Sequence, residues 1–237
     1  MIYDSIKKLA GKSRMLAILI DPNETETNQI PHLFKFAEDA SVSLVLVGGS
    51  LVARPMDPLI KVIKKHCSAP VVLFPGNPVQ LSKYADGLLL LSLISGRNPE
   101  FLIGSHVISA QYLKRSSLEI IPTGYMLFEN GSISSAEYMS NTKPLPRNKP
   151  EIAVSTAIAG EMLGLKIIYL EGGSGAREII PVEIISAVKE NIGIPLIVGG
   201  GIKNADDLAR VFDSGADIAV VGNAIERNSG ILKELIT

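Results

Sequence analysis

The sequence is poor in several features that would indicate a particular class of protein. It contains one cysteine, Cys67, among 237 residues, so an internal disulfide framework is excluded. A single thiol suits a reducing compartment, and we expect a cytoplasmic protein. The net charge of −1 gives no broad positive field, which argues against nucleic acid as a partner.

Long apolar runs and a leader pattern are also missing. The N-terminus lacks the basic-then-apolar order of a signal peptide. A helix that spans a bilayer needs about 20 predominantly apolar residues. The longest apolar run, Leu88–Ile94, is much shorter and is interrupted by Ser92. We therefore expect no transmembrane segment.

The sequence does contain a regular alternation of short apolar runs with segments of helical spacing. Apolar runs rich in β-branched residues predict buried strands. Eight of them predict an α/β fold, a (β/α)8 TIM barrel in which residues 1–237 form a single domain. A doubly wound open sheet is the alternative, but it gives no reason for functional residues at every strand end. The predicted strands are Met15–Ile20, Val42–Val47, Val71–Phe74, Gly87–Leu93, Leu118–Pro122, Lys166–Glu171, Pro195–Val198 and Asp217–Val221.

The segments between these strands mostly predict helices. The segment after the third strand is only weakly helical. The polar segment Glu129–Lys149 is long for a barrel connection, which indicates a functional or disordered loop. The predicted helices are Asn28–Ala40, Pro58–His66, Glu100–Leu113, Ile152–Leu163, Pro181–Asn191, a helix capped by Asn204 that ends at Ser214, and a short helix after Asn223.

The stretch Tyr169–Arg177 carries the clearest sign of chemistry. Gly172, Gly173 and Gly175 follow the sixth predicted strand and allow main-chain N–H groups to approach an anion. Glu171 lies at the junction, where its carboxylate could accept hydrogen bonds or a proton. Taken alone, the glycines are equally consistent with a flexible turn.

Two further glycine-rich turns lie where barrels often bind phosphate. Gly199–Gly201 follows the seventh predicted strand, and Gly222–Asn223 follows the eighth. In TIM barrels, the loops after strands 7 and 8 frequently form a phosphate site at the face where the strands end. Both turns lead into helix N-termini, whose free N–H groups favour an anion. We therefore predict a phosphate site there.

Several short motifs, spread from the first strand to the last, match one enzyme family. They are Leu19–Pro22, Val47–Ser50, Leu73–Gly76, Ser92–Pro99, Pro122–Tyr125 and Tyr169–Gly175, together with the two glycine turns. On these residues the chain resembles the geranylgeranylglyceryl phosphate synthases, a prenyltransferase family that also includes the bacterial heptaprenylglyceryl phosphate synthases. Some members have a lysine where this chain has Leu19, and the chain is more similar to the branch with Phe74-Pro75-Gly76.

The resemblance implies an activity and its partners. The family joins sn-glycerol 1-phosphate to a long polyprenyl diphosphate, here expected to be geranylgeranyl diphosphate. The reaction releases diphosphate and forms the first ether bond of a lipid, so the chain would act in phospholipid biosynthesis. The resemblance further implies Mg²⁺ as cofactor, a homo-oligomer, and transient contact with a membrane when the product is released.

The resemblance also implies roles for particular residues. Asp21 and Ser50 would bind Mg²⁺, a hard cation that takes few protein oxygens when substrate phosphates complete its shell. Glycerol phosphate would lie on two sets of residues. The first is Tyr169, Leu170, Glu171, Gly172, Gly173, Ser174 and Gly175, and the second, on the phosphate, is Gly200, Gly201, Gly222 and Asn223.

The catalytic roles are open at this stage. Glu171 either accepts the proton of the glycerol hydroxyl or only orients the glycerol. Tyr169 either binds a hydroxyl or faces an allylic cation. Arg97 either contacts diphosphate or forms a surface pair. Leu88–Leu113 and Tyr125–Phe128 either line a groove for the isoprenoid or form ordinary barrel core, and the sequence does not locate the residue that limits chain length.

A different enzyme class would share the two phosphate turns. A barrel isomerase or aldolase acting on a phosphorylated metabolite needs a catalytic lysine or a second carboxylate where a strand ends. Lys166 lies at the start of a strand instead, which favours the prenyltransferase. A barrel that only binds a ligand is a third reading without a positive signal.

Overall fold

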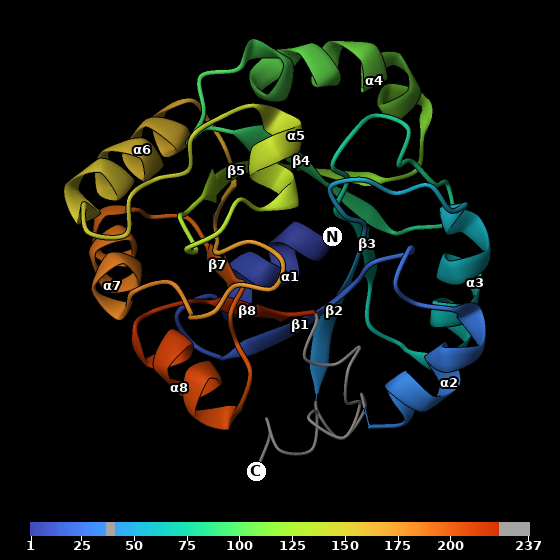
Figure 1. The fold of residues 1–237 in the computed structure, drawn as a ribbon. Coiled ribbons are helices and arrows are strands. Elements are labelled where there is room, and N and C mark those ends of the chain that lie inside the picture. The colour runs from blue at the N-terminus through green and yellow to red at the C-terminus, as the bar shows by residue number, and fades with distance from the viewer. Residues whose placement is uncertain (37–40, 223–237) are drawn as a thin grey trace.

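Eight parallel strands close into a barrel in the computed structural model, which describes residues 1–36 and 41–222. Each strand pairs with its neighbours in sequence, and β1 pairs with β8 (Figure 1). The predicted TIM barrel is therefore confirmed and the open sheet is excluded. The strands are β1 Met15–Ile20, β2 Val42–Val47, β3 Val71–Leu73, β4 Gly87–Leu93, β5 Glu119–Leu127, β6 Ile167–Glu171, β7 Leu196–Gly199 and β8 Ile218–Val221.

Most of the helices surround the ring of strands, and most of the predicted ones are present (Figure 1). Asn204 caps its helix as expected, because its side chain accepts a hydrogen bond from the main-chain N–H of Asp207. The predicted C-terminal helix lies outside the described residues. The helices are α1 Ile2–Leu9, α2 Ile30–Leu33, α3 Met56–His66, α4 Ser105–Arg115, α5 Ser135–Ser140, α6 Pro150–Met162, α7 Val182–Asn191 and α8 Ala205–Asp213.

Side chains of the strands alternate between the barrel interior and the layer beneath the helices. In β6, Ile167 and Tyr169 belong to the inner cluster, whereas Ile168 and Leu170 pack in the outer cluster. Strands that are buried on both faces explain why their sequences are nearly continuous apolar runs. Because every second residue faces inward, Glu171 points into the barrel at the end of β6.

The first helix, α1, was not predicted, and it closes the amino end of the barrel. Ile6 packs into the inner cluster, and α1 lies across the centre of the ring of strands in Figure 1. The carboxylate of Glu119, at the start of β5, accepts hydrogen bonds from the N–H groups of Ile2 and Tyr3 at 2.5 and 2.8 Å. Asp217, just before β8, accepts one from Gly11 at 2.8 Å. The active face must therefore be the opposite, open end.

Two predicted helices differ in their details. The segment predicted as helix Asn28–Ala40 begins with a 3-10 turn at Thr27–Gln29, where Glu26 and Gln29 form a capping box, and α2 proper is short. Residues 37–40 of this prediction lie outside the described residues. The predicted helix Glu100–Leu113 begins with a π-helical turn, Glu100–Gly104, and continues as α4 to Arg115. Unusual turns of this kind often occur at functional sites.

The connection between β3 and β4 has no helix, so the weak helical signal there was wrong. Next to α4, Leu90 of β4 is therefore only partly buried, whereas β3 is buried along its whole length. By contrast, the polar segment Glu129–Lys149 is ordered. It contains α5, and the main chain of Leu145 bonds to Leu127 and Glu129. This segment therefore lies beside the carboxyl end of β5, where α5 can cover part of the barrel mouth (Figure 1).

Candidate active site

Glu171 is the buried carboxylate at the open end of the barrel. Its side chain is 6% exposed, and Oε1 accepts a hydrogen bond from the main-chain N–H of Gly173 at 2.6 Å. Burial raises the pKa of the Glu171 carboxyl above its usual value, although Gly173 and Tyr169 both favour the ionised form. A carboxylate held in this way is suited to accept a proton from a bound hydroxyl.

Tyr169 lies deeper in the barrel than Glu171 and on the same side of β6. The side chain is fully buried, and its ring packs against Phe74 and Tyr125 with centroid distances of 5.3 and 5.5 Å. Its hydroxyl meets no partner at standard hydrogen-bond geometry in the described part of the chain, but it is near enough to Glu171 to favour the ionised carboxylate. This placement favours a role in orienting Glu171 over direct contact with an allylic cation.

The glycines after β6 and β7 form one tightly packed surface beside Glu171. The N–H of Gly172 donates to the carbonyl oxygen of Gly199 at 2.9 Å. Gly200 and Gly201 have φ angles of +86° and +80°, and a side chain at Gly200 would come within 2.8 Å of Glu171 Oε1. Only glycine fits these positions, and their N–H groups lie at the end of the barrel where phosphate is expected.

The other residues predicted to bind glycerol phosphate do not all face the interior of the barrel. Gly222 directly follows β8 and lies against Leu19, whereas Asn223 lies outside the described residues. Ser174 and Gly175 are exposed at the surface of the loop after β6. Leu170 points away from the barrel interior into the outer cluster. Its predicted contact with substrate therefore depends on its main chain alone.

Gly201→Ala tests the phosphate turn. A methyl group at Gly201 would overlap the carbonyl oxygen of Glu178, and φ is +80°, so the turn must move. We expect the KM for sn-glycerol 1-phosphate to rise about 10- to 100-fold, because a hydrogen bond to a charged group contributes about 1.5–3 kcal/mol. Steady-state kinetics measures this change.

Gly164→Ala is the matched control for that variant. Gly164 has a φ of +86°, with no atom within 4 Å of an added methyl group, and it follows α6 at the opposite end of the barrel. The backbone strain is therefore similar, but the KM should not change. An equal KM for the Gly201 variant and the wild type would contradict the phosphate turn.

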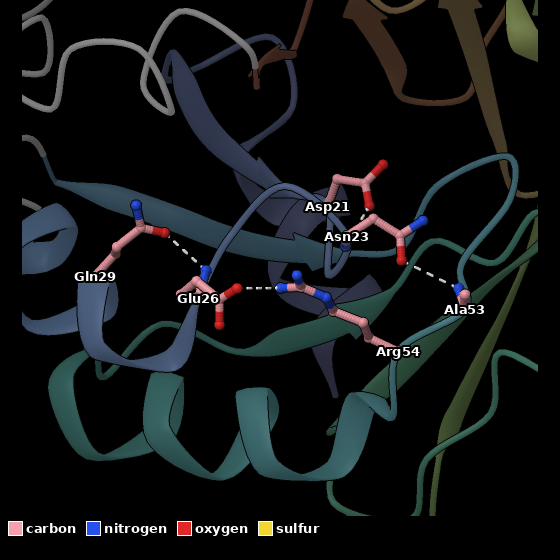
Figure 2. Close-up of polar contacts among 6 residues, drawn as sticks. All are labelled: Asp21, Asn23, Glu26, Gln29, Ala53 and Arg54. Carbon is pink, nitrogen blue, oxygen red and sulfur yellow. Dashed lines mark hydrogen bonds and ion pairs between the residues drawn. The ribbon is translucent and has the colours of Figure 1, made fainter.

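Asp21 and Ser50 lie on neighbouring connections at the same end of the barrel. Asp21 follows β1 and Ser50 follows β2. The carboxylate of Asp21 accepts a hydrogen bond from the N–H of Asn23 at 2.8 Å (Figure 2). Asp21 Oδ2 would lie 2.5 Å from a side chain at Gly49. Burial raises the pKa of the Asp21 carboxyl above its usual value, and the negative charge of Glu24 adds to this. A cation beside Asp21 would offset both effects.

These donors fit magnesium better than a transition metal. No group of three or more His, Cys, Asp and Glu side chains that could hold a metal occurs within residues 1–36 and 41–222. One carboxylate and one hydroxyl suit Mg²⁺, which keeps several waters and takes substrate phosphates as further ligands.

An apolar groove begins at Ser50 and runs between β4 and α4, where the helix after β3 is missing. At its inner end Leu113 and Ser109 of α4 face Leu88 of β4. Met126–Phe128 are buried core. The residues of the predicted ranges that do line the groove are Leu88, Leu90, Leu91, Leu93, Phe101, Ser105, His106, Ser109, Leu113 and Tyr125. The groove residues that sequence reasoning missed come from the loop after β3 and from α5. They are Phe74, Pro75, Gly76, Asn77, Pro78, Leu81, Ala136, Met139 and Ser140.

Other polar residues fall outside the predicted roles. The guanidinium of Arg97 donates to the carbonyl oxygens of Ile94 and Gly96, which gives it a structural role in this loop. The amide of Asn130 donates to the carbonyl oxygen of Gly172 at 2.9 Å and so supports the loop that holds Glu171. No sequence signal relates these two loops. Lys166 lies at the amino end of β6, 5.1 Å from the ring centre of Tyr3, and cannot serve a reaction at the open end.

The fold and this arrangement define a barrel enzyme that handles a phosphorylated substrate and an apolar one at the same rim. The family model described as the PcrB family matches residues 10–237. The chain belongs to the PcrB family.

Named relatives agree with this assignment. The geranylgeranylglyceryl phosphate synthase of Chitinophaga pinensis is 47% identical over 99% of this chain and 94% of its own. The geranylgeranylglyceryl phosphate synthase of Spirosoma linguale is 46% identical over 97% of this chain and 92% of its own. Among solved structures, the (S)-3-O-geranylgeranylglyceryl phosphate synthase of Thermoplasma acidophilum, in complex with sn-glycerol-1-phosphate, superposes with a TM-score of 0.93. It is 28% identical in sequence, and the match covers 99% of this chain and 95% of the other. The predicted family is confirmed, and a prenyltransferase is favoured over an isomerase or aldolase.

Proposed function

We propose that this protein forms the ether bond between sn-glycerol 1-phosphate and a polyprenyl diphosphate, with release of diphosphate. The observation that carries the proposal is the juxtaposition at one rim. A buried carboxylate, Glu171, lies against the glycine turns at one side, and an apolar groove starts at Ser50 on the other. The relatives named geranylgeranylglyceryl phosphate synthase support the same reaction.

The glycerol phosphate would bind on the side of β6 and β7. Its phosphate would accept hydrogen bonds from the N–H groups of Gly200, Gly201 and Gly222, and a hydroxyl would face Glu171. In the reaction the allylic C–O bond breaks and its electron pair leaves with diphosphate. The glycerol oxygen then bonds to the allylic carbon, and its proton passes to Glu171. Holding the two substrates aligned at one rim supplies much of the rate.

We propose Mg²⁺ as the cofactor, held by Asp21 and Ser50. When bound, this ion neutralises charge on the departing diphosphate. Of these two residues, only Asp21 would supply a charged ligand, its carboxylate, whereas Ser50 would supply a neutral hydroxyl. Ser50 lies at the start of the groove, so the diphosphate head and the isoprenoid tail would be bound next to each other.

The isoprenoid tail would lie in the groove along α4. Ser109 is 8% exposed and lines the inner end of the groove. We expect Ser109→Phe to lower turnover of geranylgeranyl diphosphate about tenfold or more, because overpacking costs about 1–3 kcal/mol. Dimethylallyl diphosphate should react as in the wild type, because its short tail does not reach Ser109.

Competition kinetics with the two diphosphates measures this difference. Ser155→Phe, on the exposed face of α6, is the control and should change neither rate. An unchanged preference in the Ser109 variant would show that the tail lies elsewhere.

The experiment that tests the proposed function mixes the protein with sn-glycerol 1-phosphate, Mg²⁺ and prenyl diphosphates of graded length. Formation of an ether-linked prenylglyceryl phosphate, detected by mass spectrometry, supports the proposal. The enantiomer, sn-glycerol 3-phosphate, is the specificity control. If no diphosphate of any length gives the ether while the protein is folded, the proposal fails.

We also propose a cytoplasmic homo-oligomer that contacts membranes transiently when its product is released. The outer face of α6 supports self-association, because Met162 and the adjoining Leu163 are 82% and 79% exposed. The described residues contain no helix that is long and apolar enough to cross a bilayer. The single cysteine suits a reducing compartment.

A further inference from the structure

Gln80 is a buried amide that joins two connections at the open end of the barrel. It is 2% exposed. Its Nε2 donates to the carbonyl oxygen of Gly49 at 2.8 Å, and its Oε1 accepts from the N–H groups of Gly76 and Gly49 at 3.2 and 3.4 Å. A side chain at Gly76 would lie 2.5 Å from the carbonyl oxygen of Gly49, so the two connections are in direct contact. Gln80 thus fixes the main chain immediately before Ser50.

Asn23 fixes the main chain immediately after Ser50. Its Nδ2 donates to the carbonyl oxygen of Leu51 at 2.6 Å, and its Oδ1 accepts from the N–H of Ala53 at 3.1 Å. Its own N–H donates to the carboxylate of Asp21 at 2.8 Å. Figure 2 shows Asn23 between Asp21 and Ala53. One residue therefore connects the Asp21 carboxylate to the segment that carries Ser50.

Both side chains use the donor and the acceptor of the amide at once. A carboxylate lacks the donor and an apolar side chain lacks both, so neither can replace the amide without leaving main-chain groups unpaired. The N–H of Gly48 already donates to the carbonyl oxygen of Ile20 at 3.1 Å, and the two amides, one on each side of Ser50, hold the rest of this segment beside Asp21.

We propose that Gln80 and Asn23 are positioning residues that set Ser50 relative to Asp21 for a divalent cation and the diphosphate it binds. This inference rests on the proposed function, which assigns Asp21 and Ser50 to the cation. Neither amide contacts the cation itself. Each acts through the main chain from Gly49 to Ala53, as residues behind metal ligands commonly do.

The test measures cation binding directly. Gln80→Met and Asn23→Leu keep side-chain size and remove the amide. Mn²⁺ is titrated into each protein with inorganic diphosphate present, and free Mn²⁺ is measured by electron paramagnetic resonance. We expect the Kd for Mn²⁺ to rise about 10- to 100-fold in each variant. The KM for geranylgeranyl diphosphate should rise with it, and the KM for sn-glycerol 1-phosphate should stay unchanged.

Arg54→Met is the matched control. Arg54 forms an ion pair with Glu26 at 2.6 Å between the same two connections, but both side chains are about half exposed (Figure 2). Exposed pairs contribute little, so the Kd for Mn²⁺ should equal that of the wild type. If Gln80→Met yields no folded protein by circular dichroism, Gln80→Asn, which keeps an amide but is too short to reach both partners, takes its place.

A wild-type Kd for Mn²⁺ in the folded variants would overturn the inference. So would an equal rise in both KM values, because general loosening of the barrel would affect both substrates alike. The wild-type coupling assay is separate. If the wild type forms the ether but the variants bind Mn²⁺ normally, the proposed function stands and only the inference falls.

Discussion

Glu171→Gln should lower the turnover number about 10²–10⁴-fold, which is the usual contribution of general-base catalysis. Glutamine has the same shape and can still accept the hydrogen bond from Gly173, but it cannot take the proton of the glycerol hydroxyl. The KM for sn-glycerol 1-phosphate should change little. Single-turnover kinetics with saturating substrates measures the effect. Near-normal turnover with normal affinity would leave Glu171 an orienting role only.

The pH dependence of the same variant gives a second check. Burial raises the pKa of Glu171, and a base must be deprotonated. In the wild type, turnover should therefore rise with pH through a pKa above the usual glutamate value, and Glu171→Gln should lose this pH dependence.

The raised pKa of the Glu171 carboxyl also affects stability. The contribution of this group to the free energy of unfolding is fully present below its pKa in the unfolded state and is lost as the pH rises through its pKa in the folded state. The variant should thus have a higher Tm than the wild type at neutral pH.

Asp21→Asn should lower kcat/KM for the prenyl diphosphate about 10²–10³-fold at a fixed Mg²⁺ concentration. Metal-ion catalysis contributes several kcal/mol, and about 1.4 kcal/mol corresponds to a factor of ten. The asparagine can still accept the hydrogen bond from Asn23, so the loop should remain in place. Higher Mg²⁺ concentrations should restore part of the activity, which a titration against initial rate measures.

Glu24→Gln is the control for the Asp21 variant. Glu24 is an exposed carboxylate close enough to affect Asp21 electrostatically, and its removal should leave the Mg²⁺ requirement nearly unchanged. The metal assignment would be contradicted if Asp21→Asn kept full activity and the same Mg²⁺ dependence. The KM for sn-glycerol 1-phosphate is expected to be the same in all three proteins.

The strands could be predicted from the sequence because each is buried on both faces and reads as a short apolar run. Met15–Ile20, Val42–Val47 and Gly87–Leu93 were predicted with the bounds of β1, β2 and β4, and the other strands differ mainly at their ends. Since all strands are parallel, residues that follow them must meet at one end of the barrel. This is why Asp21 and Glu171 could be placed on the same face without a structure.

Contacts between loops could not be predicted. Gln80 and Gly49 are 31 residues apart, and Asn130 and Gly172 are 42 apart. An amide in a polar loop has no periodicity, so nothing in the sequence indicates its partner. α1 was missed because its role is to close the amino end of a barrel, which is a property of the completed fold. How deeply the Tyr169 side chain lies in the barrel could not be predicted either. The alternation of side chains along a strand shows which face a residue is on, but not how far it lies from the open end.

The absence of a helix between β3 and β4 has a consequence for how this enzyme could change. The groove leaves the barrel sideways, along the outer face of β4, rather than descending through the packed interior. If the isoprenoid tail lies there as proposed, a longer or shorter hydrocarbon would alter contacts at the inner end of the groove, which α4 and β4 form, while the head group bound at the rim stays the same. On this proposal, different parts of the barrel determine tail selectivity and bond formation, so the two properties can be redesigned independently.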